Sequence, residues 1–415
     1  MERFFTTFWL LLIPTQLGRH FWLKESSVMG VRVDFLSIIF YLTDIVWLVW
    51  IGFGIKNKKN SSKKVISNLF SFQNFVLLLF VVVNVIFAEA RWVAIYRWLR
   101  LGQWWLTWQM VRKNKAEMKA LLKKIVPIWI IFEAFLGLAQ VVKGGSLNGV
   151  LWWLGERRFV YGGIGIAQIR LFDEGWIRAY GTFSHPNSLA GFLLLVWWWF
   201  KETRRENGEN KMGKLWYWVV NWCAILGIIL AGSRTVWGLT ILFLIIDQLR
   251  ATKFELKNRK FRRQLMGKSC LFLGIICLVL GVVSINYRVS DFLGGWDVDS
   301  FKKREMLALS AIKMIRSSPL FGVGAGNFVV NLPKYRVGNF YWMQPVHNIF
   351  LLAWSEIGIL GLIVFLVLGS EEARKIDWKK RIFFLMIVCL TGMIDHYWLT
   401  LPQNSWLLAI FLGII

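Results

Sequence analysis

The chain has 415 residues, of which 56% are hydrophobic and 18% are charged, and it includes 26 Trp and 33 Phe. A soluble domain cannot bury so much apolar surface, so the composition predicts a polytopic membrane protein and excludes a long disordered chain. The four cysteines all lie in apolar runs, which argues against a disulfide-stabilised secreted module and against a zinc cage. In a soluble protein the net charge of +26 would suggest a nucleic-acid partner, so its distribution along the chain has to be considered first.

The apolar runs predict an all-α fold, a polytopic transmembrane helical bundle of about 12 spans. A helix needs about 20 mostly apolar residues to cross a membrane. In chain order, the runs that approach this length lie at 4–21, 33–54, 72–88, 93–111, 125–142, 186–200, 215–231, 235–249, 270–285, 347–368, 382–396 and 404–415. The first run is interrupted by Pro14 and Gln16.

The basic residues between these runs predict the orientation. Five short hydrophilic segments hold 29 of the 50 Lys and Arg residues: 55–71, 112–124, 201–214, 250–268 and 369–381. Short loops rich in Lys and Arg stay in the cytoplasm, and one threading of twelve spans places all five there, with both termini cytoplasmic. Most of the positive charge is therefore a topology signal. No dense patch of cations and aromatics is present, so no nucleic-acid partner is expected.

This threading divides the chain into five parts. Spans one to five occupy 1–142, a long external loop 143–185, spans six to nine 186–285, a second external loop 286–346, and the last three spans 347–415. Long translocated loops largely escape the positive-inside rule, so the many Lys and Arg residues of the two external loops need another explanation. An anionic ligand such as a lipid-linked phosphate is one explanation, and contact with lipid head groups is the other.

Part of the second external loop has the pattern of an amphipathic helix. Between Phe301 and Ser318, apolar residues recur at near-helical spacing with charges between them. Pro319 should end the helix, because a proline disfavours the α conformation in the residue before it. We expect this helix to lie on the membrane or to cap a cavity. The glycine-rich GVGAGNF at 322–328 predicts a turn that closes over the site rather than a dinucleotide fingerprint, since no strand precedes it.

His347 is the first candidate for chemistry. It lies where the second external loop enters the tenth span, and Asn348 follows it. A histidine at a membrane mouth can be neutral at physiological pH and can accept a proton from a hydroxyl. An ordinary interfacial histidine is the alternative interpretation. Gly358 and Gly361 lie further along the same predicted helix and would let other helices approach closely.

Two arginines are candidates for binding an anion. Arg234 lies in AGSRT between two apolar runs, where an arginine is costly unless it reaches the interface or a partner. Arg178 precedes AYGTFSHPNSLAG, which places His185 and Asn187 at the external start of span six. Guanidinium groups bind phosphate oxygens in a bidentate manner, so the two arginines together could clamp a pyrophosphate. An interfacial anchor is the alternative role for Arg234.

Four motifs, in this order, resemble those of a known family. GTFSHPNSLAGF, AGSRT at a helix end, SPLFGVGAGNF and HNIFLLAWSEIGILG are similar to the O-antigen ligase and O-antigen polymerase family of bacterial polytopic membrane glycosyltransferases. The resemblance covers about 178–368 and extends less specifically to the flanking spans, including DHYW at 395–398. One departure is Leu362, which follows Gly361 where ligases often have a threonine.

The resemblance implies a GT-C-like fold and an inverting, metal-independent transfer on the external face of the bacterial inner membrane, without a cofactor. A glycan would leave an undecaprenyl-diphosphate carrier and join a hydroxyl of a glycan, lipid or protein acceptor, as in lipopolysaccharide biosynthesis. His347 would orient or deprotonate the acceptor, while Arg178 and Arg234 would hold the diphosphate as a leaving group. The other substrate-binding candidates are His185, Asn187 and Asn348.

Two other functions remain open. A polysaccharide polymerase would use the same lipid-linked substrates, and a transporter or flippase would move lipid-linked oligosaccharides across the membrane. Asp44 and Glu133 fall inside apparent spans, where carboxylates often mark ion or proton paths. Arg97 and Arg100 could neutralise both carboxylates, which would make the set structural.

Two smaller acidic motifs have alternative interpretations. Asp297 and Asp299 form a DxD that could bind a metal beside a sugar phosphate, but chance occurrence in a polar loop explains it better, and no metal site is predicted. Asp395 and His396 fall on the correct side of the membrane to line a cavity with the other candidates.

Overall fold

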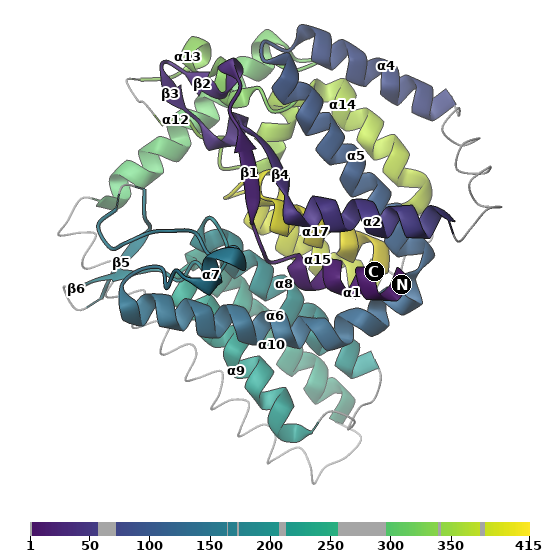
Figure 1. Ribbon diagram of the computed structural model, residues 1–415, viewed down its shortest axis with the longest axis vertical. Helices are drawn as coiled ribbons and strands as arrows, with labels where there is room; N and C mark the ends of the chain where they lie inside the picture. The colour runs from purple at the N-terminus through teal and green to yellow at the C-terminus, as the bar shows by residue number, and fades with distance from the viewer. Residues whose placement is uncertain are drawn as a thin grey trace. The chain divides into compact units, whose positions relative to one another are not determined.

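The computed structural model describes residues 2–56, 72–163, 165–171, 174–206, 213–255, 296–338, 342–373 and 378–415. The chain forms two compact units. The first comprises Met1–Leu122 and Val298–Ile415, and the second comprises Lys123–Asp297. Both units consist mostly of helices (Figure 1).

Helices from both ends of the chain build the first unit. They are α1 (Glu2–Leu12), α2 (Leu42–Lys56), α4 (Phe72–Phe87), α5 (Arg91–Lys113), most of α12 (Trp296–Ser317), α13 (Phe328–Tyr335), α14 (Ile349–Ala373), α15 (Trp378–Gly392), α16 (Tyr397–Thr400) and α17 (Pro402–Ile414). The C-terminal helix α17 packs along α5, and α1 packs along α2. The first unit is therefore held together by contacts between segments that are far apart in the sequence.

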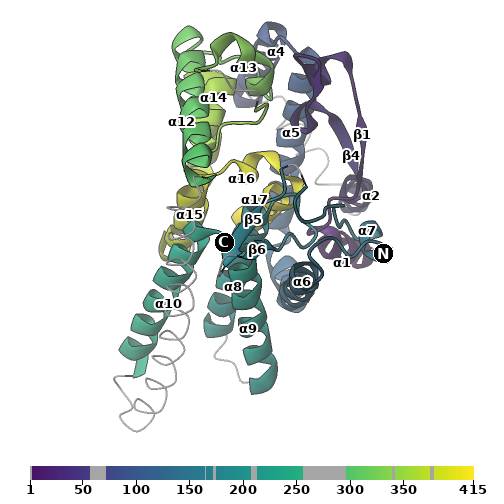
Figure 2. The ribbon, with the colours of Figure 1, turned by 90° about the vertical axis from the view of Figure 1, so that its left-hand side faces the viewer.

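The second unit is built around α8. Its helices are most of α6 (Lys115–Lys143), α7 (Val150–Trp153), α8 (Pro186–Glu206), α9 (Lys214–Ala231) and α10 (Arg234–Glu255). α8 packs against both α9 and α10 (Figure 2). Its apolar side chains from Leu189 to Trp199 are buried all round the helix, as expected of a helix at the centre of a bundle.

Most of the predicted spans coincide with a helix, in the predicted order, while 270–285 lies outside the described residues. The predicted loop 112–124 is largely helical, because only Asn114 separates α5 from α6. By length and composition, two of the described helices, Lys115–Lys143 and Ile349–Leu366, suffice to cross a membrane. Shorter apolar helices lie at Leu42–Phe53, Phe75–Phe87, Leu215–Ala231 and Ile382–Gly392. These helices support a membrane protein, and the full count of twelve spans stays a prediction.

Short strands interrupt the predicted all-α fold. β1 (Gly18–Phe21) pairs antiparallel with β4 (Ile38–Tyr41), β2 (Ser27–Val28) with β3 (Val31–Arg32), and β5 (Gln168–Leu171) with β6 (Glu174–Ile177). The predicted span 4–21 is therefore wrong as a single helix, because α1 ends at Leu12, two residues before Pro14. Residues 13–41, called the N-terminal excursion below, form strands and short turns between α1 and α2.

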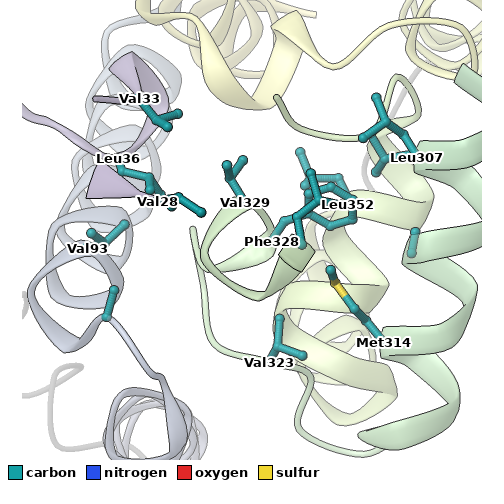
Figure 3. Close-up of a cluster of buried hydrophobic side chains, with 14 residues drawn as sticks. Val28, Val33, Leu36, Val93, Leu307, Met314, Val323, Phe328, Val329 and Leu352 are labelled. Atoms are coloured by element: carbon teal, nitrogen blue, oxygen red, sulfur yellow. The ribbon is translucent and has the colours of Figure 1, made fainter. Parts of the chain in front are cut away.

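One hydrophobic cluster joins the N-terminal excursion to the helices of the last third of the chain. Its buried members are Val28, Val33, Leu36, Ala90, Val93, Leu307, Ala311, Met314, Val323, Phe328, Val329, Leu332, Val346 and Leu352. Figure 3 shows the side chains of α12, α13 and α14 on one side, facing those of the excursion and of α5 on the other. Because Val346 and Leu352 belong to the cluster, it holds the chain on both sides of His347 in place.

The amphipathic helix predicted at 301–318 is confirmed as α12, which ends at Ser317, before Pro319. Part of its apolar face is buried within the first unit. Leu307, Ala311 and Met314 are fully buried in the cluster formed with α13 and α14. The helices that pack on these three side chains remove them from solvent, so α12 is an integral part of the first unit.

The glycine-rich segment after Pro319 packs into a break in α14. Gly358 interrupts α14 with φ 63° and ψ −178°, which are not helical angles. Across the break, the Val323 N–H donates to the Ser355 carbonyl oxygen at 2.8 Å. A Cβ atom at Gly358 would lie 2.3 Å from the carbonyl oxygen of Leu320, so only glycine allows this approach. The backbone of the segment thus replaces helical hydrogen bonds that the break removes.

Asn84 of α4 completes the hydrogen bonding around this break. Its Nδ2 donates to the carbonyl oxygens of Phe321 and Glu356, at 2.9 and 3.1 Å. Its Oδ1 accepts from Trp98 Nε1 and from the Ala325 N–H, both at 2.9 Å. The amide therefore uses both donors and both acceptor positions, and it ties α4 and α5 to α14.

The two carboxylates in apparent spans have different partners. Asp44 forms a buried ion pair with Arg100, 2.5 Å between Oδ1 and Nη1, and accepts from the Tyr41 N–H at 2.9 Å. Glu133 instead accepts from the backbone N–H and the hydroxyl of Thr182, at 3.0 and 2.6 Å. Neutralisation by an arginine of the fourth span is thus confirmed for Asp44, and the described partner of Glu133 is Thr182. Both carboxylates are engaged in structural contacts.

Candidate functional site

In the first unit, His347 lies beside a carboxylate. His347 lies two residues before the start of α14, and Asp395 follows α15. The distance between His347 Nδ1 and Asp395 Oδ1 is 3.5 Å, and both side chains are largely buried. Nδ1 is buried and makes no hydrogen bond to any residue that the structure describes. A carboxylate in this position can orient an imidazole and stabilise a positive charge on it.

Asn348 caps α14 and ties its start to the segment that carries Asp395. Its Oδ1 accepts from the backbone N–H groups of the second and third helical residues, at 2.9 and 3.0 Å. Asparagine is among the favoured N-cap residues because its side chain satisfies these otherwise unpaired donors. Its Nδ2 donates to the carbonyl oxygen of Met393 at 3.2 Å. Asn348 therefore helps to place His347 next to Asp395.

His396 and Phe35 complete the surroundings of His347. The rings of His396 and His347 are 5.0 Å apart between centroids, with an interplanar angle of 45°. The backbone N–H of His396 donates to Asp395 Oδ1 at 2.8 Å, and its Nδ1 lies 2.7 Å from Thr400 Oγ1. Phe35 of the N-terminal excursion packs edge-on against His396, at 5.3 Å. The excursion thus reaches the same group of side chains as α14 and α16.

In the second unit, Arg178 is held by two hydrogen bonds. Its Nε donates to the carbonyl oxygen of Ala231 at 2.8 Å, and its Nη2 donates to Asn187 Oδ1 at 2.6 Å. The first bond uses the C-terminal end of α9, and the second uses the first turn of α8. The guanidinium group is therefore oriented by the ends of two helices, which lowers the entropy cost of binding an anion.

Arg234 lies at the turn that Arg178 contacts. It is the first residue of α10, and its side chain is exposed. Gly232 at this turn has a φ of +64°, and a Cβ there would lie 3.0 Å from the Nε of Arg178. The glycine thus permits the tight turn and the approach of Arg178. Two arginines at the N-terminal end of α10, where the helix dipole is positive, suit an anionic ligand.

His185 and Asn187 occupy the start of α8. His185 directly precedes the helix, and its Nδ1 accepts from the Asn187 N–H at 3.1 Å, as an N-cap side chain does. Pro186 is the first helical residue, where its fixed φ suits the helix and its missing N–H costs little. Asn187 in turn accepts from Arg178. The structure therefore brings Arg178, His185 and Asn187 together through direct contacts.

Two side chains of α6 hold the backbone that follows Arg178. Gln140 Oε1 accepts from the N–H groups of Tyr180 and Gly181, at 3.1 and 2.7 Å. Glu133 holds the next residue, Thr182, by the two hydrogen bonds given above. Every one of these side chains is fully buried. Residues 180–182 are thus fixed to α6 over three consecutive positions.

Tyr180 closes this network on the side of the preceding loop. Its hydroxyl oxygen accepts from the Ala167 N–H at 2.7 Å, and its ring packs against Phe159 with centroids 4.5 Å apart. Burial raises the pKa of the Tyr180 phenol, so the hydroxyl stays neutral over the physiological range. Tyr180 is therefore a packing and hydrogen-bonding residue.

Sequence reasoning missed the roles of three residues in these sites. Phe35 was assigned to a membrane span, and Gln140 lies in an apolar run without a motif. Glu133 was noticed as a carboxylate in a span, but its bond to Thr182 depends on how α6 packs. An isolated polar residue in an apolar helix is the available signal for Gln140 and Glu133, since burying such a group is costly without a partner.

Asp297 and Asp299 lie in the first turn of α12.

The comparisons with known proteins agree with the motifs. Residues 219–366 match the family described as O-Antigen ligase. No curated protein matches the chain, and no solved structure does. The match includes Arg234, His347 and Asn348, whereas Arg178 precedes it and Asp395 follows it. Three of the four motifs lie within this match and GTFSHPNSLAGF precedes it, so the predicted resemblance is confirmed over residues 219–366, called the family domain below.

Proposed function

We propose that this protein is a membrane glycosyltransferase of the O-antigen ligase type, in the bacterial inner membrane with both termini cytoplasmic. It transfers a glycan from an undecaprenyl-diphosphate carrier to an acceptor hydroxyl on the external face, without a metal ion. The observation that carries the proposal is the pairing of His347 with Asp395, 3.5 Å apart, at one end of the family domain. This pairing fits a general base better than an ordinary interfacial histidine.

His347 acts on the acceptor. With Asp395 facing Nδ1, the Nδ1–H form of the ring leaves the lone pair on Nε2 for the acceptor hydroxyl. The distance of 3.5 Å is longer than a hydrogen bond, and such contacts commonly shorten when substrate is bound. As the hydroxyl attacks, His347 takes its proton and Asp395 stabilises the resulting imidazolium. Asn348 positions the pair through its cap on α14.

Arg178 and Arg234 act on the donor. The bond between the anomeric carbon and the carrier phosphate oxygen breaks as the bond to the acceptor oxygen forms on the opposite face, which inverts the anomeric centre. The electron pair of the broken bond goes to the diphosphate, and the two guanidinium groups stabilise this growing negative charge. Asn187 and His185 act as positioning residues, because they hold Arg178 and the start of α8.

The test is transfer by the purified protein in vesicles with a radiolabelled undecaprenyl-diphosphate glycan. We expect the wild type to release the glycan from its lipid carrier. His347→Ala should reduce the rate by about 100-fold or more, which is the usual contribution of a general base, while the carrier still binds. His20→Ala is the matched control, since His20 is an exposed residue of β1 and should leave the rate unchanged. Equal rates in both variants would remove His347 from the mechanism.

The same assay separates the two alternative functions. A polymerase would extend the glycan on a second carrier-linked glycan, so that the label would stay lipid-linked and grow in size. A lipid-linked oligosaccharide transporter would move the intact label across the bilayer equally with and without His347. Transporters often contain discontinuous helices, and the broken helix α14 resembles them in this respect. Its carbonyl groups at Ser355 and Glu356 are already used by backbone and Asn84 donors, which favours a structural role for the break.

A further inference from the structure

His347, Asp395 and His396 form a cluster with the composition of a metal site. One potential ligand atom from each residue lies within 4.8 Å of the other two. Asp395 and His396 are buried, and the side chain of His347 is only 16% exposed. Two imidazoles and one carboxylate are a donor set that Zn²⁺ binds in proteins, with further positions left to water or other ligands.

The spacing between His347 and Asp395 already suits a bound ion. Zinc holds nitrogen and oxygen ligands at about 2.0–2.2 Å, so neighbouring ligands in a tetrahedral site are about 3.4 Å apart. His347 Nδ1 and Asp395 Oδ1 are 3.5 Å apart. Nδ1 is also buried without a hydrogen bond among the described residues, which is an unfavourable state for a polar atom. An ion between these two atoms would supply the missing partner.

The third ligand is held in a suitable form by its own neighbour. Thr400 Oγ1 donates its single proton to the carbonyl oxygen of His396, at 3.1 Å. The hydroxyl oxygen therefore accepts from His396 Nδ1–H, at 2.7 Å. In this tautomer the lone pair lies on Nε2, the nitrogen that would bind a metal. An outer hydrogen bond of this kind fixes the ring of most metal-bound histidines.

We propose that His347, Asp395 and His396 bind one divalent transition-metal ion, best suited to Zn²⁺, and that this ion inhibits the protein. Only the inhibition rests on the function proposed above. A metal ion on Nδ1 of His347 leaves the ring proton on Nε2, and a protonated nitrogen cannot take the proton of an acceptor hydroxyl. The ion also occupies the carboxylate that would stabilise the imidazolium. The metal is thus an inhibitor of a reaction that needs none.

Binding is tested first, without any glycan. The full-length protein in detergent, freed of metal with a chelator, is titrated with Zn²⁺ against a chromophoric zinc indicator. We expect one site per chain, with affinity lowered at least about 10- to 100-fold in Asp395→Asn and in His396→Gln. The matched control His20→Gln changes a histidine outside the cluster and should bind as the wild type does. Wild-type affinity in both cluster variants would overturn the site.

A second measurement uses the wild type alone, so that folding defects of the variants cannot affect the conclusion about the metal site. Co²⁺ replaces Zn²⁺ in the wild type, and its visible absorption reports whether nitrogen and oxygen ligands surround it. A spectrum identical to that of hydrated Co²⁺ would also overturn the site. These binding measurements hold or fail whether or not the protein transfers a glycan.

Inhibition is tested in the vesicle assay with the wild type. We expect Zn²⁺ at saturating concentration to stop glycan release and a chelator to restore it fully. Unchanged release at a saturating concentration would refute the inhibitory role, and so would faster release, which would make the metal an activator. If no release occurs under any condition, the proposed function fails while the binding result stands.

Discussion

Arg178 is oriented before any ligand binds. Its hydrogen bonds to the Ala231 carbonyl oxygen and to Asn187 fix both the Nε and the Nη2 edges of the guanidinium group. A lysine in its place has a single ammonium on a flexible stem and cannot make both contacts. The role proposed for Arg178 therefore depends on the planar shape of its side chain as well as on its charge.

We predict that Arg178→Lys and Arg234→Lys both lower the transfer rate severely, and that Asn187→Ala lowers it by about tenfold. A hydrogen bond to a charged group is worth about 1.5–3 kcal/mol, and about 1.4 kcal/mol corresponds to a factor of ten. The loss in Asn187→Ala should be a higher KM for the carrier, since the arginine remains but is less well oriented. The matched control Arg158→Lys, which changes an exposed arginine of the same segment 143–185 as Arg178, should be neutral. Losses as large in the control would show that exchanging arginine for lysine in this segment impairs the protein without regard to the proposed site.

Helix α6 supports the segment that follows Arg178. Gln140 and Glu133 lie on α6, two turns apart, and their side chains accept hydrogen bonds from three consecutive residues, 180–182. A buried acceptor without a donor costs about 1–3 kcal/mol, so these contacts disfavour any other path of the segment. Through Gln140 and Glu133, the apolar helix α6 is thus a rigid support for residues 180–182, which follow Arg178.

We predict that Gly181→Ala reduces both stability and transfer. Gly181 has a φ of +57°, and a Cβ atom there would lie 2.0 Å from Glu133 Oε2. The strained backbone alone costs about 1–3 kcal/mol, and the clash would also displace the carboxylate. The thermal unfolding midpoint in detergent measures this effect. Gly238→Ala is the control, because Gly238 lies in α10 with nothing within 4 Å of an added Cβ. An unchanged midpoint for Gly181→Ala would contradict this account.

The break in α14 leads to a second prediction about the thermal stability of a single helix variant. Gly358→Ala should unfold at a markedly lower temperature, because an added Cβ would collide with the Leu320 carbonyl group and the φ of +63° is strained. Gly102→Ala in α5 changes a helical glycine with open space around it, and alanine there should be neutral or stabilising by about 0.5–1 kcal/mol. If both variants unfold alike, the fit of 319–324 into the break is not important for stability.

At the scale of the whole molecule, the family match does not coincide with either compact unit. The family domain at 219–366 begins in the second compact unit and ends in the first. Asn84 and the cluster around Phe328 show that its last part packs on helices from the N-terminal third of the chain. The family domain is therefore not a separate folding unit of this protein.

We predict from the basic segments that residues 143–185 face outward and that the α5–α6 corner faces the cytoplasm. In a background with the four native cysteines replaced, Val150→Cys should react with a membrane-impermeant maleimide in intact cells stripped of their outer barrier. Lys113→Cys should react only after lysis. Both positions are exposed, so reactivity reports the side of the membrane. The reverse pattern would invert the orientation and place His347 in the cytoplasm.

The sequence by itself determined the class of protein, most helix positions, the family and the candidate residues His347, Arg178 and Arg234. These properties are carried by composition, local periodicity and short motifs, which need no knowledge of tertiary contacts. The span predictions failed at 13–21 and 33–41, because apolar residues there suit a strand as well as a helix, and the pairing of β1 with β4 decided between the two.

Only the tertiary structure decided which groups surround these residues. Asp395 meets His347 because α15 returns the chain to the start of α14, and Phe35 reaches His396 because the N-terminal excursion packs on the same cluster. The partner of Glu133 likewise depended on the packing of α6 against residues 180–182. Such contacts join segments far apart in the chain, and the physical reason that local patterns miss them is that burial of shared surfaces, rather than any local preference, selects them.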